Sequence, residues 1–255
     1  MSPLLKDKVA IITGAGRGLG RAFALRYADE GARLFLPDIS LQRAEGVADE
    51  IRAKGGEAVA VETDISDENA TTKMAEEVVQ HYGKVDILLN NAAIYYGIEA
   101  KPWDTWTVEE WDRIFAVNVR GTWLCCKAVA PLMTKRSSGK IINITSDIIR
   151  SPDSQYFLAY ALSKVAVYTM THSLAAALGP SGINVNAIAP GYTATEASLS
   201  QSGSEQLFES VIAAQYIRRR EEPADIVGTA VFLASQESDF ITGQLIFING
   251  GHLML

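Results

Sequence analysis

Short runs of apolar, often β-branched residues alternate along the chain with longer segments in which apolar residues recur every three or four positions. The runs are typical of strands buried on both faces of a sheet, and the longer segments of helices that cover it. Strands are expected at residues 9–13, 33–37, 58–62, 86–90, 140–144, 184–188 and 245–248. Helices are expected at residues 19–30, 41–54, 68–82, 108–135, 157–178 and 223–234. Regular alternation of the two indicates βαβ units.

This order of elements predicts an α/β fold: a single doubly wound Rossmann-fold domain over residues 1–255, with a seven-stranded parallel sheet and helices on both faces. A chain of 255 residues is long enough to bury one large core of this kind. Residues 195–217 differ from the rest, because they are rich in Ser, Gln and Glu and separate a strand from the next helix. We interpret this segment as a substrate lid, with a plain excursion of the chain as the alternative.

Composition narrows the classes of partner. Acidic residues outnumber basic ones by 30 to 23, for a net charge of −7, and the one basic run is residues 218–220. We therefore expect no nucleic-acid partner and no membrane partner. The two cysteines are adjacent, which argues against a disulfide framework, and three scattered histidines argue against a bound metal. The N-terminal residues carry no long apolar segment, so we expect a cytoplasmic protein.

A glycine-rich turn, residues 13–20, follows the first expected strand. Gly14, Gly18 and Gly20 permit a tight turn and a close approach of the backbone to a pyrophosphate at the start of the next helix. The spacing differs from the common G-x-G-x-x-G dinucleotide pattern, and a purely structural turn is the alternative. The position directly after the first strand favours a dinucleotide site.

Asp38 ends the second expected strand. A carboxylate there accepts hydrogen bonds from the ribose hydroxyls of the adenosine and repels a 2′-phosphate, which favours NAD over NADP. Arg17 argues the other way, because a basic side chain in the glycine turn can reach a 2′-phosphate. A poorly solvated carboxylate outweighs one flexible arginine, so we expect NAD. The alternative role for Asp38 is to cap the next helix, which Ser40 can do instead.

Tyr160 and Lys164 lie four residues apart in an expected helix and therefore share one face. A tyrosine phenol titrates near pH ~10. A neighbouring ammonium favours the phenolate and lowers that pKa, so the pair is suited to move a proton at neutral pH. This spacing also occurs by chance, so it supports a catalytic pair only in combination with the other motifs of the chain.

Together these motifs resemble the short-chain dehydrogenase/reductase family, over essentially the whole chain. The matching positions, in chain order, are residues 13–20, Asp64, residues 90–93, Asn118, Ser146, residues 160–164, residues 190–195, residues 242–244 and residues 249–251. The resemblance implies an oxidoreductase that transfers a hydride at a nicotinamide ring, with NAD as cofactor and a homotetrameric assembly. An apolar C-terminal tail, residues 253–255, also favours an oligomer.

The family's functional residues carry over position by position. The resemblance implies that Tyr160 is the general acid/base, that Lys164 lowers its pKa and holds the nicotinamide ribose, and that Ser146 orients the substrate oxygen. Asn118 resembles a residue that kinks its helix and anchors a water relaying protons to Lys164; a buried amide that satisfies backbone groups is the alternative. The cofactor-binding residues are expected to be Gly14, Arg17, Gly18, Leu19, Gly20, Asp38, Asp64, Ile65, Asn91, Tyr160, Lys164, Pro190, Gly191, Thr193 and Thr195.

Two departures from the family pattern stand out. Ser146 lies 14 residues before Tyr160, one more than usual, so the usual serine position falls on Asp147. A carboxylate there repels a developing alkoxide, so we interpret the difference as a one-residue insertion in residues 147–155, with Ser146 keeping its role. Ala93 replaces the usual glycine and adds a methyl group near the nicotinamide, which we expect to be tolerated.

Aromatic and apolar residues are the candidates for the substrate pocket, and several can equally be core. They are Tyr95, Tyr96, Ile148, Ile149, Tyr156, Phe157 and Tyr192, of which Tyr96, Ile148, Tyr156 and Tyr192 join Ser146 as the predicted substrate contacts. Arg150 is the one arginine placed to bind an acidic group. The small-molecule substrate is therefore expected to be a hydrophobic secondary alcohol or ketone, including aromatic ones, and the segments 90–95 and 141–146 loosely resemble dehydrogenases of 1-phenylethanol-type alcohols.

Two other functions stay open. A 3-oxoacyl-thioester reductase belongs to the same family, but Asp38 disfavours the NADPH usual in biosynthetic reduction, and the chain lacks a basic patch for an acidic carrier. A non-catalytic NAD-binding sensor has no need of the Ser146, Tyr160 and Lys164 set.

Overall fold

A computed structural model describes residues 3–254; Met1, Ser2 and Leu255, the last residue of the apolar tail, lie outside the described residues. Its centre is one seven-stranded sheet in the order β3-β2-β1-β4-β5-β6-β7, and every neighbouring pair is parallel. The strands are β1 Val9–Ile12, β2 Arg33–Asp38, β3 Ala58–Glu62, β4 Ile87–Asn90, β5 Gly139–Ile144, β6 Ile183–Pro190 and β7 Leu245–Ile248. The predicted doubly wound sheet is confirmed, with strand ends shifted by one or two residues.

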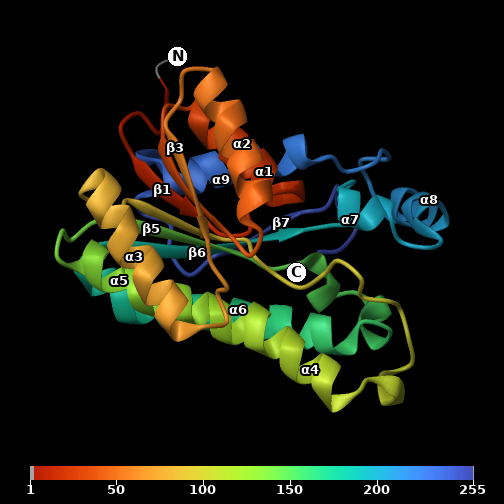
Figure 1. Cartoon of the computed structure of the whole chain (residues 1–255). Helices are drawn as coiled ribbons and strands as arrows, with labels where there is room; N and C mark the ends of the chain where they lie inside the picture. The colour runs from red at the N-terminus through yellow and green to blue at the C-terminus, as the bar shows by residue number, and fades with distance from the viewer. Residues whose placement is uncertain (1–2, 255) are drawn as a thin grey trace.

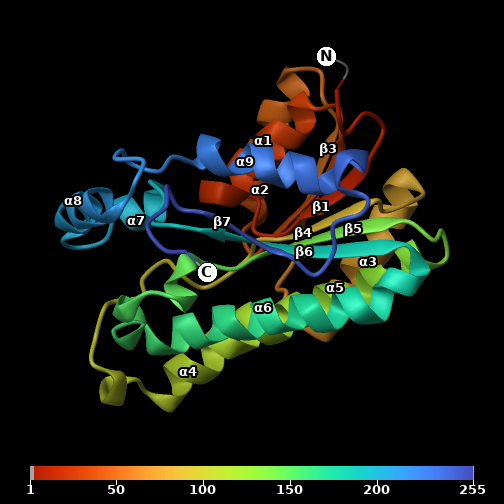
Figure 2. The same ribbon diagram turned by 180° about the vertical axis from the view of Figure 1, so that it is seen from behind.

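Three helices cover one face of the sheet, as Figures 1 and 2 both show. They are α1 Gly18–Asp29, α2 Leu41–Ala53 and α9 Pro223–Ala234. Phe23 and Tyr27 of α1 are fully buried there against apolar strand residues. The Tyr27 hydroxyl donates to the Ala230 carbonyl of α9 at 2.9 Å, which joins the two helices across 203 residues.

The opposite face is covered by α3 Glu68–Tyr82, α4 Val108–Phe115, α5 Thr122–Thr134 and α6 Leu158–Leu178 (Figure 2). Both cysteines are buried and free in this second core. Within residues 3–254, no helix combines the length and the apolar character needed to cross a membrane.

The helix expected at residues 108–135 is continuous but not regular. Between α4 and α5 the chain forms a π-helical stretch, Ala116–Gly121, which contains Asn118. A Cβ on Gly121 would lie 2.8 Å from the Ile65 side chain and 3.1 Å from its carbonyl, so the helix packs closely on the loop after β3 here. Such bulges mark functional positions more often than chance.

The segment at 195–217 contains two helices that the sequence did not predict, α7 Glu196–Leu199 and α8 Ser204–Ala214. They project beyond the carboxyl ends of the strands, at one end of the sheet (Figure 1). Two side chains of α8, Phe208 and Val211, are buried. The polar composition of the segment hid this apolar face.

Candidate active site

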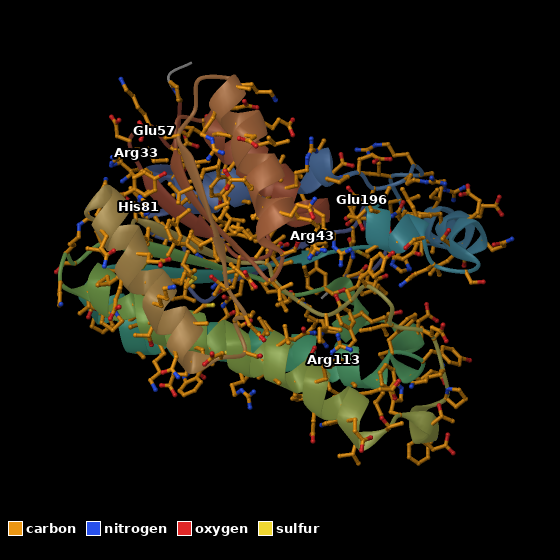
Figure 3. The ribbon with its side chains drawn as sticks, viewed as in Figure 1. Arg33, Arg43, Glu57, His81, Arg113 and Glu196 are labelled. Atoms are coloured by element: carbon orange, nitrogen blue, oxygen red, sulfur yellow. The ribbon has the colours of Figure 1, made fainter. Side chains whose placement is uncertain are left out.

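A cleft of about 910 Å³ lies along the carboxyl ends of the strands. The strand order reverses between β1 and β4, and ligands of open α/β sheets bind at such a switch point. Every predicted catalytic and cofactor residue except Asn118 lines this cleft, as do the predicted substrate residues. Arg43 of α2 and Arg113 of α4 approach it from opposite layers, and Glu196 of α7 lies at the end formed by the projecting helices (Figure 3). Ile149 and Arg150 do not line it.

The glycine turn fits a dinucleotide cradle. Gly14 has φ +64°, and a Cβ there would lie 2.8 Å from the backbone of Ala92. A Cβ on Gly20 would collide with the Gly14 carbonyl. These glycines are needed because backbone meets backbone, and the start of α1 is left open to the cleft.

Asn91 holds that turn in place from β4. Its side-chain amide donates to the carbonyls of Thr13 at 3.0 Å and Gly14 at 3.2 Å, while its backbone N–H donates to the Thr13 hydroxyl at 3.0 Å. Its amide nitrogen is thereby committed to the glycine turn. Asn91 therefore shapes the cofactor cleft by positioning Gly14.

Asp38 ends β2 with its side chain buried at 5% exposure. It accepts from the backbone N–H groups of Gly16 and Ser40, each at 2.9 Å, and from the Arg43 guanidinium at 3.2 Å. Ser40, not Asp38, caps α2, so the alternative role for Asp38 is filled by its neighbour. Arg43 was missed from the sequence, and it brings a positive charge to the position that separates NAD from NADP.

Two predicted cofactor-binding residues, Asp64 and Ile65, follow β3. Asp64 accepts from the backbone N–H of Ser66 at 2.9 Å and from its hydroxyl at 2.7 Å, and Ile65 is buried at 5% exposure. Both line the cleft beside Asp38. An apolar side chain next to a carboxylate suits a flat heteroaromatic ring with a polar edge.

Ser146, Tyr160 and Lys164 converge at the middle of the cleft. Ser146 follows β5, and its oxygen accepts from the Ile148 N–H at 3.3 Å, which leaves its own proton free to donate. Tyr160 and Lys164 lie in α6, with the ammonium 5.6 Å from the phenol ring centre. Lys164 also donates to the Ile144 carbonyl at 2.9 Å. The structure thus brings the three predicted residues together in one cleft.

Burial controls the proton affinities of the pair. It raises the pKa of Tyr160 above its ordinary value, an effect that the nearby Ser146 hydroxyl partly offsets. Burial also lowers the pKa of Lys164 to about 8. In the protein alone Tyr160 is therefore the neutral phenol while Lys164 is still mostly an ammonium at neutral pH, and further positive charge beside the phenol favours the phenolate.

Asn118 is a buried amide whose groups are all used. Its oxygen accepts from the Ile94 N–H at 2.7 Å, and its nitrogen donates to the Ile94 carbonyl at 3.3 Å and to the Ser163 hydroxyl at 3.1 Å. Ser163 in turn donates to the Tyr160 carbonyl at 2.7 Å. Asn118 thus ties the π-helical stretch to the loop after β4 and to the helix that carries Tyr160.

Comparison with known proteins agrees with this geometry. A family model described as enoyl-(acyl carrier protein) reductase matches residues 14–252. A 3-oxoacyl-[acyl-carrier-protein] reductase, FabG, of Staphylococcus epidermidis is 35% identical over 97% of this chain and 100% of its own. The chain belongs to the short-chain dehydrogenase/reductase family.

Other members of the family also match nearly the whole chain. A short-chain dehydrogenase/reductase of Hericium erinaceus, EriH, is 39% identical over 96% of this chain and 97% of its own. The crystal structure of levodione reductase superposes with a TM-score of 0.91 at 30% identity, over 97% of this chain and 98% of that one. Membership makes the protein an oxidoreductase of a family that typically uses a nicotinamide cofactor.

Aromatic rings line the end of the cleft where the predicted substrate residues lie, which we call the substrate end. Tyr95 packs against Tyr160 with ring centres 5.2 Å apart, and Tyr192 packs against Phe208 of α8 at 4.4 Å. Gln201 accepts from both Tyr192, at 3.1 Å, and Tyr95, at 3.5 Å. The segment at 195–217 therefore contacts both walls of the cleft.

Tyr96 and Tyr156 stand at the open rim. They are 51% and 45% exposed, and the Arg17 guanidinium lies 4.3 Å from the ring centre of Tyr96. Arg17 therefore bridges the glycine turn to the loop after β4.

A cluster of ionisable groups behind Ser146 was missed from the sequence. The carboxylate of Asp147 accepts from Asn249 at 3.4 Å and contacts the His252 ring nitrogen Nδ1 at 3.2 Å. Glu221 is buried beside them, where it accepts from the Thr193 hydroxyl at 2.6 Å, and burial raises its pKa to about 7. Residues this far apart in sequence give no signal that they meet. Within residues 3–254, these and the other acidic, His and Cys side chains form no metal-binding group.

Proposed function

We propose that the protein transfers a hydride between NAD(H) and a hydrophobic secondary alcohol or its ketone, including aromatic ones. The observation that carries the proposal is the meeting of Ser146, Tyr160 and Lys164 in one cleft with a glycine cradle on one side and aromatic side chains on the other. A small-molecule substrate of this kind needs an apolar wall and a few polar groups at the reacting oxygen.

The chain's own residues divide the chemistry. The bound nicotinamide supplies or accepts the hydride. Tyr160 removes the hydroxyl proton during oxidation and returns it during reduction. Ser146 donates to the substrate oxygen as negative charge builds on it. Lys164 holds a positive charge beside the phenol and a donor for the ribose. Asn118 fixes the helix turn behind them.

The cofactor cradle supports a dinucleotide along the predicted residues. The start of α1 would hold the pyrophosphate, Asp38 the adenosine ribose, and Gly191 to Thr195 the nicotinamide end. A Cβ on Gly191 would lie 2.8 Å from Glu221 and 2.9 Å from Asn249, so the Gly191 backbone already packs closely against these two residues. Asp38 favours NAD, because its negative charge disfavours a 2′-phosphate; Arg43 weakens that effect without removing the carboxylate.

Reduction of a 3-oxoacyl thioester is the second candidate. It is favoured by the 35% identity to the Staphylococcus epidermidis 3-oxoacyl-[acyl-carrier-protein] reductase. The net charge of −7 opposes docking of an acidic carrier, and Asp38 opposes NADPH. We therefore rank the alcohol/ketone couple first.

We further propose a homotetramer with residues 195–217 acting as a substrate lid. Trp123 of α5 and Leu162 and Val165 of α6 are exposed on the outer layer, at 44%, 40% and 39%. Such a face suits burial against another copy of the chain. Two free buried cysteines suit a cytoplasmic location.

A panel of secondary alcohols with NAD and NADP, followed by absorbance of the reduced cofactor, tests the proposal. Wild type and Tyr160→Phe are compared, with Tyr168→Phe, on the same helix but outside the cleft lining, as a control. We expect NAD-dependent oxidation of apolar alcohols that Tyr160→Phe abolishes and Tyr168→Phe retains. Binding of NADH without turnover of any alcohol, ketone or thioester would instead identify a sensor.

A further inference from the structure

His252 occupies a position in the cleft that the hydride-transfer chemistry does not use. It lines the same cleft as Ser146 and Tyr160. Its Nδ1 is bound to Asp147, and among residues 3–254 its other ring nitrogen, Nε2, makes no hydrogen bond. A carboxylate on one nitrogen fixes the ring and its tautomer, and the opposite nitrogen is then presented to whatever fills the cleft.

The chain around His252 is built to hold it there. Gly250 and Gly251 both have positive φ, +61° and +80°, which lets the chain turn back toward β5. Asn249 closes the turn: its oxygen accepts from the Gly251 N–H at 3.1 Å, and its carbonyl accepts from the His252 N–H at 3.0 Å. The Asn249 amide also reaches Asp147. The same residue thus positions both members of the pair.

The surroundings decide which ligand group suits Nε2. Asp147 borders the ring directly, Asp153 adds negative charge, and Glu221 adds more once it ionises, since burial raises its pKa to about 7. These carboxylates oppose a second anion, so a substrate carboxylate or phosphate is disfavoured. An uncharged oxygen gains a charge-assisted hydrogen bond from the imidazolium without that repulsion.

We infer that His252, held by Asp147, binds a second, uncharged oxygen of the substrate, so that the preferred substrates are diketones or hydroxyketones and not simple ketones. This deepens the proposed function and rests on it for the reacting carbonyl. Ser146 and Asp147 are consecutive residues. The reacting oxygen would contact Ser146, and the second oxygen would contact His252, which Asp147 holds in place.

Protonation of His252 gives the pair a pH signature. The Asp147 hydrogen bond raises the pKa of His252 above its ordinary value. Below that pKa, Nε2 carries a proton and donates to a carbonyl. Above it, the proton stays on Nδ1 beside Asp147, and Nε2 becomes an acceptor that serves a hydroxyl but not a carbonyl. The preference for a diketone should therefore be present at low pH and disappear as pH rises through the raised pKa.

The test uses cyclohexane-1,4-dione and cyclohexanone, which differ by one carbonyl, with saturating NADH. His252→Phe should lower kcat/KM for the dione by roughly tenfold or more, the scale of one hydrogen bond to a charged group, and for cyclohexanone by less than about threefold. His252→Gln keeps a donor without a titration, so it should restore part of the preference and make the ratio independent of pH. His172→Leu, on an exposed position of α6, is the control.

A binding arm separates this inference from the proposed function. Calorimetry with saturating NAD⁺, where a ketone cannot be reduced, gives the Kd of each ketone for wild type and both His252 variants. A dione preference that His252→Phe removes supports the inference even if no ketone is turned over. Equal ratios of dione to cyclohexanone in wild type and His252→Phe, in both kinetics and binding, overturn it while the proposed function stands.

Discussion

The nucleotide end of the cleft and its substrate end differ in which parts of the chain, backbone or side chains, form them. The nucleotide end consists mainly of backbone held by short loops after β1 and β2, with Gly14, Gly20 and Asp38 fixed by hydrogen bonds or close contacts. The substrate end consists of side chains from separate loops, such as Tyr95 and Gln201. One end is therefore formed mainly by backbone, and the other by side-chain contacts between segments far apart in sequence.

The largest contrast is expected at the boundary between the two ends, at Tyr160. Tyr160→Phe removes the proton donor and acceptor while keeping the ring that packs on Tyr95. We expect kcat to fall by roughly 10³, within the range of general acid/base catalysis. Titration of NADH fluorescence should show at most a few-fold loss of cofactor affinity, about the scale of one hydrogen bond. Loss of NADH binding in this variant would mean that the two ends are not separable.

Ser146→Ala should have the next largest effect. It removes one donor from the substrate oxygen, which costs roughly 10² in kcat. Asp147→Ala should reduce kcat much less, because its carboxylate is bound to Asn249 and His252. Steady-state kinetics on both variants compares them. Greater damage from Asp147→Ala would assign the orienting role to Asp147 and reject the insertion interpretation.

Asp38→Ala probes the nucleotide end alone. Removing the carboxylate takes away acceptors for the ribose and the repulsion of a 2′-phosphate, so the preference for NAD over NADP should shrink by roughly tenfold. Arg43→Ala should lower kcat/KM for NADP more than for NAD, because it removes a neighbouring positive charge. A wild-type kcat/KM for NADP that equals or exceeds the value for NAD would contradict the assignment.

Glu221 tests the stability of the substrate end. Its folded pKa of about 7 lies above the ordinary value, so the carboxyl stabilises the fold at low pH and costs stability as pH rises from about 4.5 through 7. Glu221→Gln mimics the protonated form. It should raise Tm by a few degrees at pH 8, for roughly 2 kcal/mol, and change it little at pH 4.5. Glu209→Gln, exposed on α8, is the control, and equal shifts in both variants would contradict the explanation.

The same contrast explains what could be predicted from the sequence. The strands were placed to within one or two residues because each is a short apolar run between helical patterns. Tyr160 and Lys164 were placed because four residues along a helix define a face. The contact of Asp147 with His252 joins positions 105 residues apart, and no local pattern reports it. The helix α8 was hidden because its two buried residues, Phe208 and Val211, lie in a polar segment.

Arg43 and Asn91 show the same limit. Arg43 was missed from the sequence, and only the structure shows that it pairs with Asp38; Asn91 was expected near the cofactor, and only the structure shows that its amide binds the glycine turn. Local sequence thus locates a side chain near a site, and the tertiary contacts decide what its polar atoms do.

The central claim is that Tyr160 exchanges the proton while the nicotinamide exchanges the hydride, and the pH dependence of alcohol oxidation tests it most directly. Burial raises the pKa of Tyr160, and the charges of Lys164 and the oxidised ring must overcome this in the NAD⁺ complex. With saturating NAD⁺ and a carbinol-deuterated alcohol to show that hydride transfer limits the rate, kcat/KM should rise with pH through one ionisation centred below ~10, the ordinary tyrosine value. The loss is on the acid side because the phenolate is the active form. A flat profile from about pH 6 to 10 with a full isotope effect would contradict the claim.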